Sequence, residues 1–136
     1  LKYDYLKAED AASVSRIIID VGEASDLTVI CYLTGKDGIG IQDTRIHAAA
    51  GAKVHLVQIY EAGAEARVIS SIGGRYEEKA GLDLIQVVTG NGDISLGCFA
   101  NLAGRKSYLN IDNGYLMSGK GTFDINYINN IKIRKI

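Results

Sequence analysis

The sequence contains no proline, no tryptophan and only two cysteines, Cys31 and Cys98. A chain without proline keeps a donor at every backbone N–H, which favours continuous strand ladders. No apolar run approaches the roughly 18 residues of a membrane-spanning helix, so none is expected. Two widely separated cysteines do not form a disulfide framework, and we therefore expect a cytoplasmic protein.

Net charge and length further limit the kinds of protein that this sequence can represent. The 136 residues carry a formal net charge of -1, and 47% of them are hydrophobic. This balance is typical of one folded domain, not of a disordered chain or of a basic nucleic-acid-binding protein. The N-terminus lacks the pattern of a signal peptide. A start at Leu1 suggests a piece of a longer protein.

Glycine is abundant, with 16 residues, and it punctuates runs rich in Ile, Val, Tyr and Thr. Such runs predict short strands separated by turns. We expect residues 1–14 to form an N-terminal extension with a short helix at Lys7–Ser13, and residues 15–136 to form a β core. The predicted strands are Arg16–Val21, Leu27–Leu33, Gly40–His47, Lys53–Tyr60, Ala66–Ile72, Leu82–Val88, Asp93–Ala100, Ser107–Asp112, Gly121–Ile128 and Ile131–Ile136. The predicted turns are Val21–Ala24, Gly35–Gly38, Gly73-Gly74, Gly90–Gly92 and Asp112–Gly114.

An internal repeat indicates how these strands are arranged. The pattern of residues 24–32 returns at residues 51–59, 27 positions later, and again more loosely at residues 79–87. Each copy has a pair of small residues, then a charged residue in the first two copies, and then a strand with apolar residues at alternate positions. Further strands between the copies indicate two strands per repeat. A period of this size in β-rich sequence predicts an all-β solenoid, a single-domain right-handed parallel β-helix.

The alternation of side chains is incomplete, which leaves a second fold open. Leu27–Leu33 is apolar on both faces, as expected for parallel strands that are covered on both sides. In a solenoid, a partner, a second layer or further sequence would cover the outer face. The alternative is an antiparallel sandwich or barrel, which the hairpin-like pair Asn91-Gly92 favours locally.

Several phrases resemble one known family. They are "SRIIIDVGEASDLTVICYL", "DTRIHAAAGAKVHLVQIYEAG" and "EEKAGLDLIQVV", followed by Tyr115–Gly121 and Asp124–Tyr127. Together they resemble the core domain of SufB and SufD, from about Arg16 to about Asn130. The phrases are strand-and-turn patterns without a catalytic signature. They are similar to a short or truncated SufD-like member of that family.

The resemblance implies a role for the chain. SufB and SufD are the scaffold and accessory subunits of the SUF machinery for iron–sulfur cluster assembly. It implies protein contacts with a SufC-like ABC ATPase and with another SufB/SufD protomer or a second copy of this chain, and no enzymatic activity. No nucleic-acid or membrane partner is expected. A transient cluster in the complex is the only cofactor that the resemblance implies, and the lack of a cysteine motif favours the accessory role.

Few residues offer metal or cluster chemistry. Cys31 and Cys98 are weak candidates for cluster binding, because thiolates are the usual ligands but normally occur in closely spaced sets. Both also suit a buried apolar position. His47 and His55 are weak candidates for metal binding, since imidazole is a good iron ligand. The 27-residue shift places His55 opposite Thr28, so a joint site of Cys31 and His55 is a hypothesis.

Other chemistries find little support. The glycine pairs near Arg75 and Asp93 lack the Gly-x-x-x-x-Gly-Lys-Ser/Thr pattern of a phosphate-binding loop. Scattered carboxylates leave open a carbohydrate-binding or polysaccharide-active β-helix, the alternative function. The alternating basic and apolar tail, residues 132–136, is typical of an edge strand or of a coil that continues.

Overall fold

The computed structural model describes residues 2–4 and 12–131 of the chain. The strands are β1 (Lys2–Asp4), β2 (Ala12–Val21), β3 (Asp26–Ala48), β4 (Lys53–Tyr76), β5 (Gly81–Gly90), β6 (Asp93–Leu102), β7 (Tyr108–Met117) and β8 (Phe123–Ile131). All pairings between the described strands are parallel. The predicted parallel β-solenoid is confirmed, with about four turns, and the antiparallel alternative is wrong.

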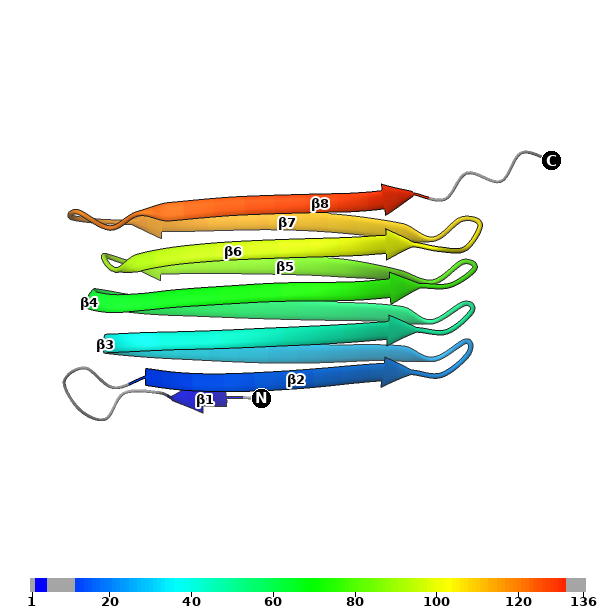
Figure 1. The fold of residues 1–136 in the computed structure, drawn as a ribbon, viewed down its shortest axis with the longest axis horizontal. Coiled ribbons are helices and arrows are strands. Elements are labelled where there is room, and N and C mark those ends of the chain that lie inside the picture. Colours follow the sequence, from blue (N-terminus) through cyan, green and yellow to red (C-terminus); the bar gives the residue numbers. More distant parts are fainter. Residues whose placement is uncertain (1, 5–11, 132–136) are drawn as a thin grey trace.

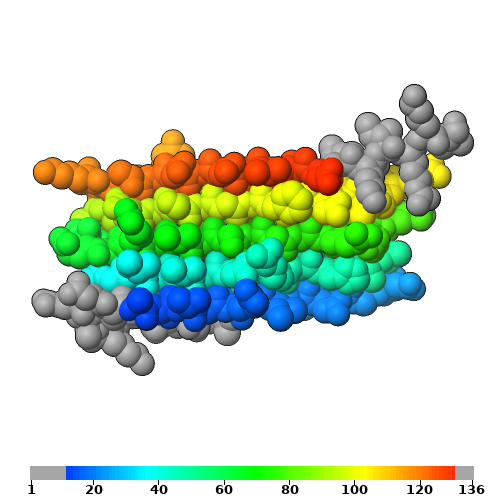
Figure 2. Space-filling model, in the orientation of Figure 1, coloured from blue at the N-terminus to red at the C-terminus, as the bar shows by residue number. Residues whose placement is uncertain are grey.

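Two parallel ladders face each other. The first sheet consists of β1, residues 26–35 of β3, residues 53–62 of β4, β5 and β7. The second sheet consists of β2, residues 37–48 of β3, residues 65–76 of β4, β6 and β8. In Figure 1 the second sheet lies in front of the first, and the chain alternates between them. One passage through both sheets makes one rung, and Figure 2 shows the rungs as bands of colour stacked along the solenoid.

The core lies between the two sheets and is divided in two. Along each strand, buried residues alternate with more exposed ones, because successive side chains point to opposite faces. One apolar cluster includes Val54, Leu56 and Leu84, and the other includes Tyr60 and Val88. Buried polar side chains lie between these clusters: Gln42, Thr44, Gln58, Ser70 and Gln86. We call this group of five residues the polar seam.

The three glutamines of the polar seam belong to a chain of hydrogen bonds with one direction. Asn113 Nδ2 donates to the Tyr127 hydroxyl at 2.5 Å, and Tyr127 donates to Gln86 Oε1 at 2.7 Å. Gln86 Nε2 donates to Gln58 Oε1 at 3.0 Å. Gln58 Nε2 faces Gln42 Oε1 at 3.5 Å, and Gln42 Nε2 has no partner among the described residues. Stacked amides thus satisfy most of one another's polar atoms inside an apolar core.

Turns at one end of the solenoid repeat the same backbone geometry in every rung. Each turn from the second sheet to the first contains one residue with positive φ: Ala24 (53°), Gly51 (72°), Lys79 (58°) and Lys106 (57°). Hydrogen bonds stack these turns, since Ala24 N donates to Ala50 O and Gly51 N donates to Glu78 O. The left-handed region is costly for residues with a Cβ, and three of the four positions accept that cost.

Two predicted turns are wrong. Gly73-Gly74 lies within β4, and Asp112–Gly114 lies within β7. A Cβ on Gly73 would lie 2.5 Å from Arg45 Nη1, and one on Gly74 would lie 2.1 Å from the Tyr76 hydroxyl. The two glycines therefore leave space for large neighbours instead of bending the chain. In β7, the ladder with β5 extends across all ten residues and overrides the local turn preference.

The remaining differences lie near the ends and at one bulge. The helix predicted at Lys7–Ser13 falls mostly outside the described residues, and Ala12 and Ser13 are part of β2. The last predicted strand, Ile131–Ile136, also lies outside them except for Ile131. Gly35–Gly38 lies inside the single long strand β3, at the register shift where the chain passes from the first sheet to the second, so the predicted turn coincides with this crossing. Among the described residues, no helix is long and apolar enough to cross a membrane.

The stacked turns generate a test of backbone strain. We expect Gly51→Ala to lower the free energy of unfolding by about 1 kcal/mol, because φ is 72° while the nearest atom to an added Cβ lies 3.6 Å away. Lys79→Gly at the equivalent position should raise it by up to about 1 kcal/mol. Urea denaturation measures both. Changes of the same sign would contradict the strain argument.

Two buried tyrosines test how much a hydrogen bond of a buried hydroxyl contributes to stability. Burial raises the pKa of both hydroxyls, Tyr60 and Tyr76, so both stay protonated. Tyr60 donates to Ser70 Oγ at 2.7 Å, whereas the Tyr76 hydroxyl has no partner among the described residues. We expect Tyr60→Phe to cost about 1 kcal/mol of unfolding free energy and Tyr76→Phe to cost nothing or to stabilise. Thermal unfolding measures both variants. Equal decreases in their stability would contradict the assignment of a hydrogen bond to Tyr60 and none to Tyr76.

Candidate functional site

Both cysteines point into the core. Cys31 in β3 and Cys98 in β6 are each 4% exposed and belong to the same apolar cluster. Burial raises the pKa of the Cys31 thiol and raises that of Cys98 to about 11. Because the thiolate is the metal ligand, thiols held protonated are poor initial ligands for a cluster. In this fold the two cysteines pack as small apolar residues.

The two histidines lie on opposite outer faces. His55 is on the outer side of the first sheet, with Nε2 at 3.0 Å from Asp26 Oδ1 and Nδ1 at 3.2 Å from Asp83 Oδ2. Asp83 also accepts a hydrogen bond from Asn110 at 2.8 Å. These four residues come from four successive rungs. His55 is therefore held between carboxylates of the rung before it and the rung after it.

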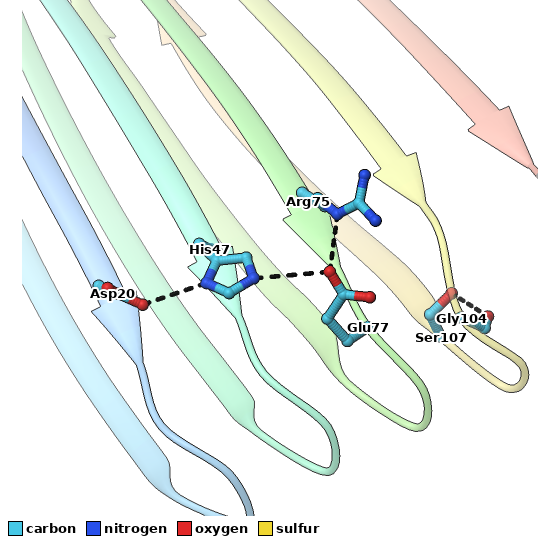
Figure 3. Close-up of polar contacts among 6 residues, drawn as sticks. All are labelled: Asp20, His47, Arg75, Glu77, Gly104 and Ser107. Atoms are coloured by element: carbon cyan, nitrogen blue, oxygen red, sulfur yellow. Dashed lines mark hydrogen bonds and ion pairs between the residues drawn. The ribbon is translucent and has the colours of Figure 1, made fainter.

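His47 has the same arrangement on the outer side of the second sheet. Its Nδ1 lies 3.2 Å from Asp20 Oδ1 and its Nε2 lies 3.5 Å from Glu77 Oε1. Figure 3 shows the ring between the two carboxylates. Arg75 Nε contacts the same Glu77 carboxylate at 2.7 Å. The hydrogen bond from Arg75 lowers the pKa of Glu77 against the opposing effect of burial, and contacts with His47 add to it. This cluster joins three rungs near the end of the strands.

The geometry separates the residues of the hypothetical joint site. His55 lies opposite Thr28, as the repeat predicts, but its ring is on the outer face while the Cys31 side chain is inside. His47 and His55 are likewise not brought together. Among the described residues, no group of three His, Cys, Asp or Glu side chains is arranged to hold a metal ion. Metal binding by the histidines remains a prediction.

The outer side of the second sheet carries a notch that sequence reasoning missed. It has a volume of about 320 Å³, and Gly73 and Gly74 are among the residues that line it. Exposed Ile18 and Phe99 border it together with Arg45. The sequence feature that could have indicated the notch is the glycine pair. It predicted a turn instead, because nothing in the sequence showed that both glycines lie within a strand.

Two arginines on the same side of this sheet form ion pairs with one aspartate, Asp43. Arg16 Nε lies 3.1 Å from Asp43 Oδ2, and Arg45 Nε lies 3.0 Å from Asp43 Oδ1. Ser71 Oγ donates to the same carboxylate at 3.2 Å. Partial burial acts to raise the pKa of Asp43, but the hydrogen bonds from Arg45 and Ser71 and the two positive charges outweigh it and lower the pKa. The cluster is a set of internal ion pairs.

Comparison with known protein families gives a match over most of the chain. Residues 5–134 match the SufBD core domain of the SUF system for FeS cluster assembly. No curated protein and no solved structure matches the chain. The match begins earlier and ends later than the resemblance visible in the strand-and-turn phrases.

Burial of the cysteines predicts slow thiol chemistry in the folded protein. With a pKa of about 11, only about one Cys98 in a thousand is thiolate at pH 8. We expect Ellman's reagent to modify both cysteines at least about 100-fold more slowly in native buffer than in guanidinium chloride. The matched control is Ser95→Cys, at an exposed position of the same strand, which should react rapidly. Fast native-state modification without that substitution would refute the buried-thiol assignment.

Proposed function

The chain belongs to the SufBD core domain family of the SUF iron–sulfur cluster assembly system, and from that membership we propose that it is an accessory subunit acting through protein contacts. Its partners in this proposal are a SufC-like ABC ATPase and another SufB/SufD-type protomer or a second copy of the chain. The observation that carries the proposal is the family match over residues 5–134, nearly the whole sequence. SufB/SufD proteins are generally non-catalytic scaffold components.

The C-terminal end of the solenoid supports a protomer contact. Within residues 2–4 and 12–131, β7 pairs with β5 alone and β8 with β6 alone, so the described strands leave one edge of each unpaired. Large apolar side chains are exposed near these edges, including Tyr115, Leu116 and Ile128 at 67%, 76% and 53%. Open strand edges with apolar neighbours are typical sites of strand addition by another chain. A second protomer at this end would cover both features.

The state of the cysteines supports the accessory role over the scaffold role. Cys31 and Cys98 are buried and their pKa values are raised, so neither offers a ready thiolate to a cluster. In this proposal the cluster is cargo, and its first ligands come from the partner protomer. The proposed site of action is the cytoplasm. The carbohydrate-active alternative has no comparable support, because the family match points to cluster assembly.

Affinity purification tests the proposed partners. The full-length tagged protein, expressed in its native cells, should recover a SufC-like ATPase and a second SufB/SufD-type protein, both identified by mass spectrometry. Leu116→Asp should reduce recovery of the second protomer at least about tenfold, because a charge at a desolvated contact is strongly unfavourable. Ile18→Asp is the matched control, at 74% exposure near the opposite end. It should leave recovery of both partners unchanged.

Two outcomes would contradict the proposal. Recovery of neither partner with the unsubstituted protein would remove the assembly role. Equal losses with Leu116→Asp and Ile18→Asp would remove the assignment of the protomer contact to the C-terminal end.

A further inference from the structure

An apolar block lies on the outer side of the first sheet. We use "column" for side chains at the same position on successive rungs. One column contains Ile30, Val57 and Ile85, and the next contains Tyr32, Ile59 and Val87. Ile30, Ile85 and Val87 are 54%, 43% and 37% exposed, and the others are half-buried. A contiguous group of this kind on a sheet face marks an interaction surface more often than scattered exposed residues do.

Carboxylates border this apolar block. Asp83 lies in the column on one side, which also contains Thr28 and His55, and Asp26 lies one column farther out, in register with Lys53. Glu61 lies in the column on the other side, and Asp112 follows Ile85 on the next rung. Asp26 and Asp83 contact His55, and Glu61 accepts a hydrogen bond from the Tyr32 hydroxyl. In the part of the chain that the structure describes, none of the four carboxylates forms an ion pair with lysine or arginine.

The second sheet provides the contrast within the same molecule. Its outer side also exposes isoleucines, at Ile41 and Ile69. There, however, Arg16 and Arg45 neutralise Asp43, and Arg75 contacts Glu77. Over residues 26–35, 53–62, 81–90 and 108–117, the outer side of the first sheet, by contrast, carries these four carboxylates and a single lysine, Lys53, so its net charge is negative.

We propose that this face, the two apolar columns with their border of carboxylates, is a docking surface for a basic amphipathic helix of a partner protein. Parallel sheets are normally covered on both faces, most often by helices. The apolar stripe of such a helix would cover Ile85, Val57 and their neighbours. Lysines and arginines on its flanks would meet the acidic border. This inference does not depend on the SUF partners proposed above.

The dimensions fit a helix that lies along the solenoid axis. The columns of Asp83 and Glu61 are six residues apart along the strands, or roughly 20 Å. A helix with its side chains is about 10–12 Å across, which leaves a few ångströms on each side for basic side chains to reach the carboxylates. The apolar columns span three rungs, which at about 4.8 Å spacing give roughly 10 Å of length, or nearly two helical turns, and Asp112 lies on the rung beyond them.

A designed peptide tests the surface directly. The probe is a fluorescein-labelled 18-residue helix with a leucine stripe and lysine flanks, and its counterpart carries glutamate in place of every lysine. In fluorescence anisotropy at low salt, the lysine peptide should bind the full chain at least tenfold more tightly than the glutamate peptide. Ile85→Asp should weaken its binding at least tenfold. Asp83→Lys, a second variant that leaves the apolar columns intact, should weaken it severalfold and reduce its salt dependence.

The matched control is Ile69→Asp, since Ile69 is 39% exposed on the other sheet. It should change the affinity less than twofold, and circular dichroism verifies that each variant is folded. Equal binding of the two peptides, or equal losses with Ile85→Asp and Ile69→Asp, would overturn the proposal. It would also be overturned if the chain formed a dimer in light scattering that Ile85→Asp converted to a monomer, because the occupant would then be a second copy.

Discussion

The rest of the structure depends on the parallel register that places each rung directly on the previous one. From β2 to β8, a strand residue meets its equivalent 26 to 29 positions later. The same kind of residue therefore recurs along a column: leucines and valines inside, glutamines in the polar seam, and carboxylates around each histidine. A polar side chain that would be isolated in another fold can here meet a chemically similar one on a neighbouring rung, as Gln58 meets Gln86.

The polar seam gives this register a specificity that apolar packing alone does not provide. Leucine and valine tolerate a shift along a strand, because apolar contacts have little directionality. The amides of Gln58 and Gln86 are satisfied only when the two residues lie opposite each other. A shift of one residue would point one of them to the outside and leave the other buried without a partner, a loss of a few kcal/mol. We infer that the seam helps to select one stacking among several that would bury similar apolar area.

Much of the architecture could be predicted from the sequence, because the repeat is itself the rung. The shift of 27 residues gave the alignment of Thr28 with His55, and most strand positions follow from the alternating apolar runs. It was harder to predict whether an individual side chain points into the core or to the outside. Leu27–Leu33 is apolar at both inner and outer positions, so the sequence did not distinguish the buried Cys31 from the exposed Ile30. The glycine pair in β4 led to a wrong prediction for a related reason. Arg45 is close to Gly73 only in the folded chain, and the sequence does not show that the neighbouring Tyr76 ring occupies the space beside Gly74.

The near-constant length of the rungs has a consequence for how such a chain can change. Insertion or loss of one whole rung would preserve every column and would move one end of the solenoid by about 4.8 Å along its axis. Insertion of a single residue within a strand would exchange inner and outer faces for the rest of that strand. The extra residues that β4 carries beside the bulge, Gly63 and Ala64, lie between the two sheets, where the alternation is interrupted in any case. The solenoid can therefore change its length in steps of one rung, while the inward and outward orientation of its side chains stays the same.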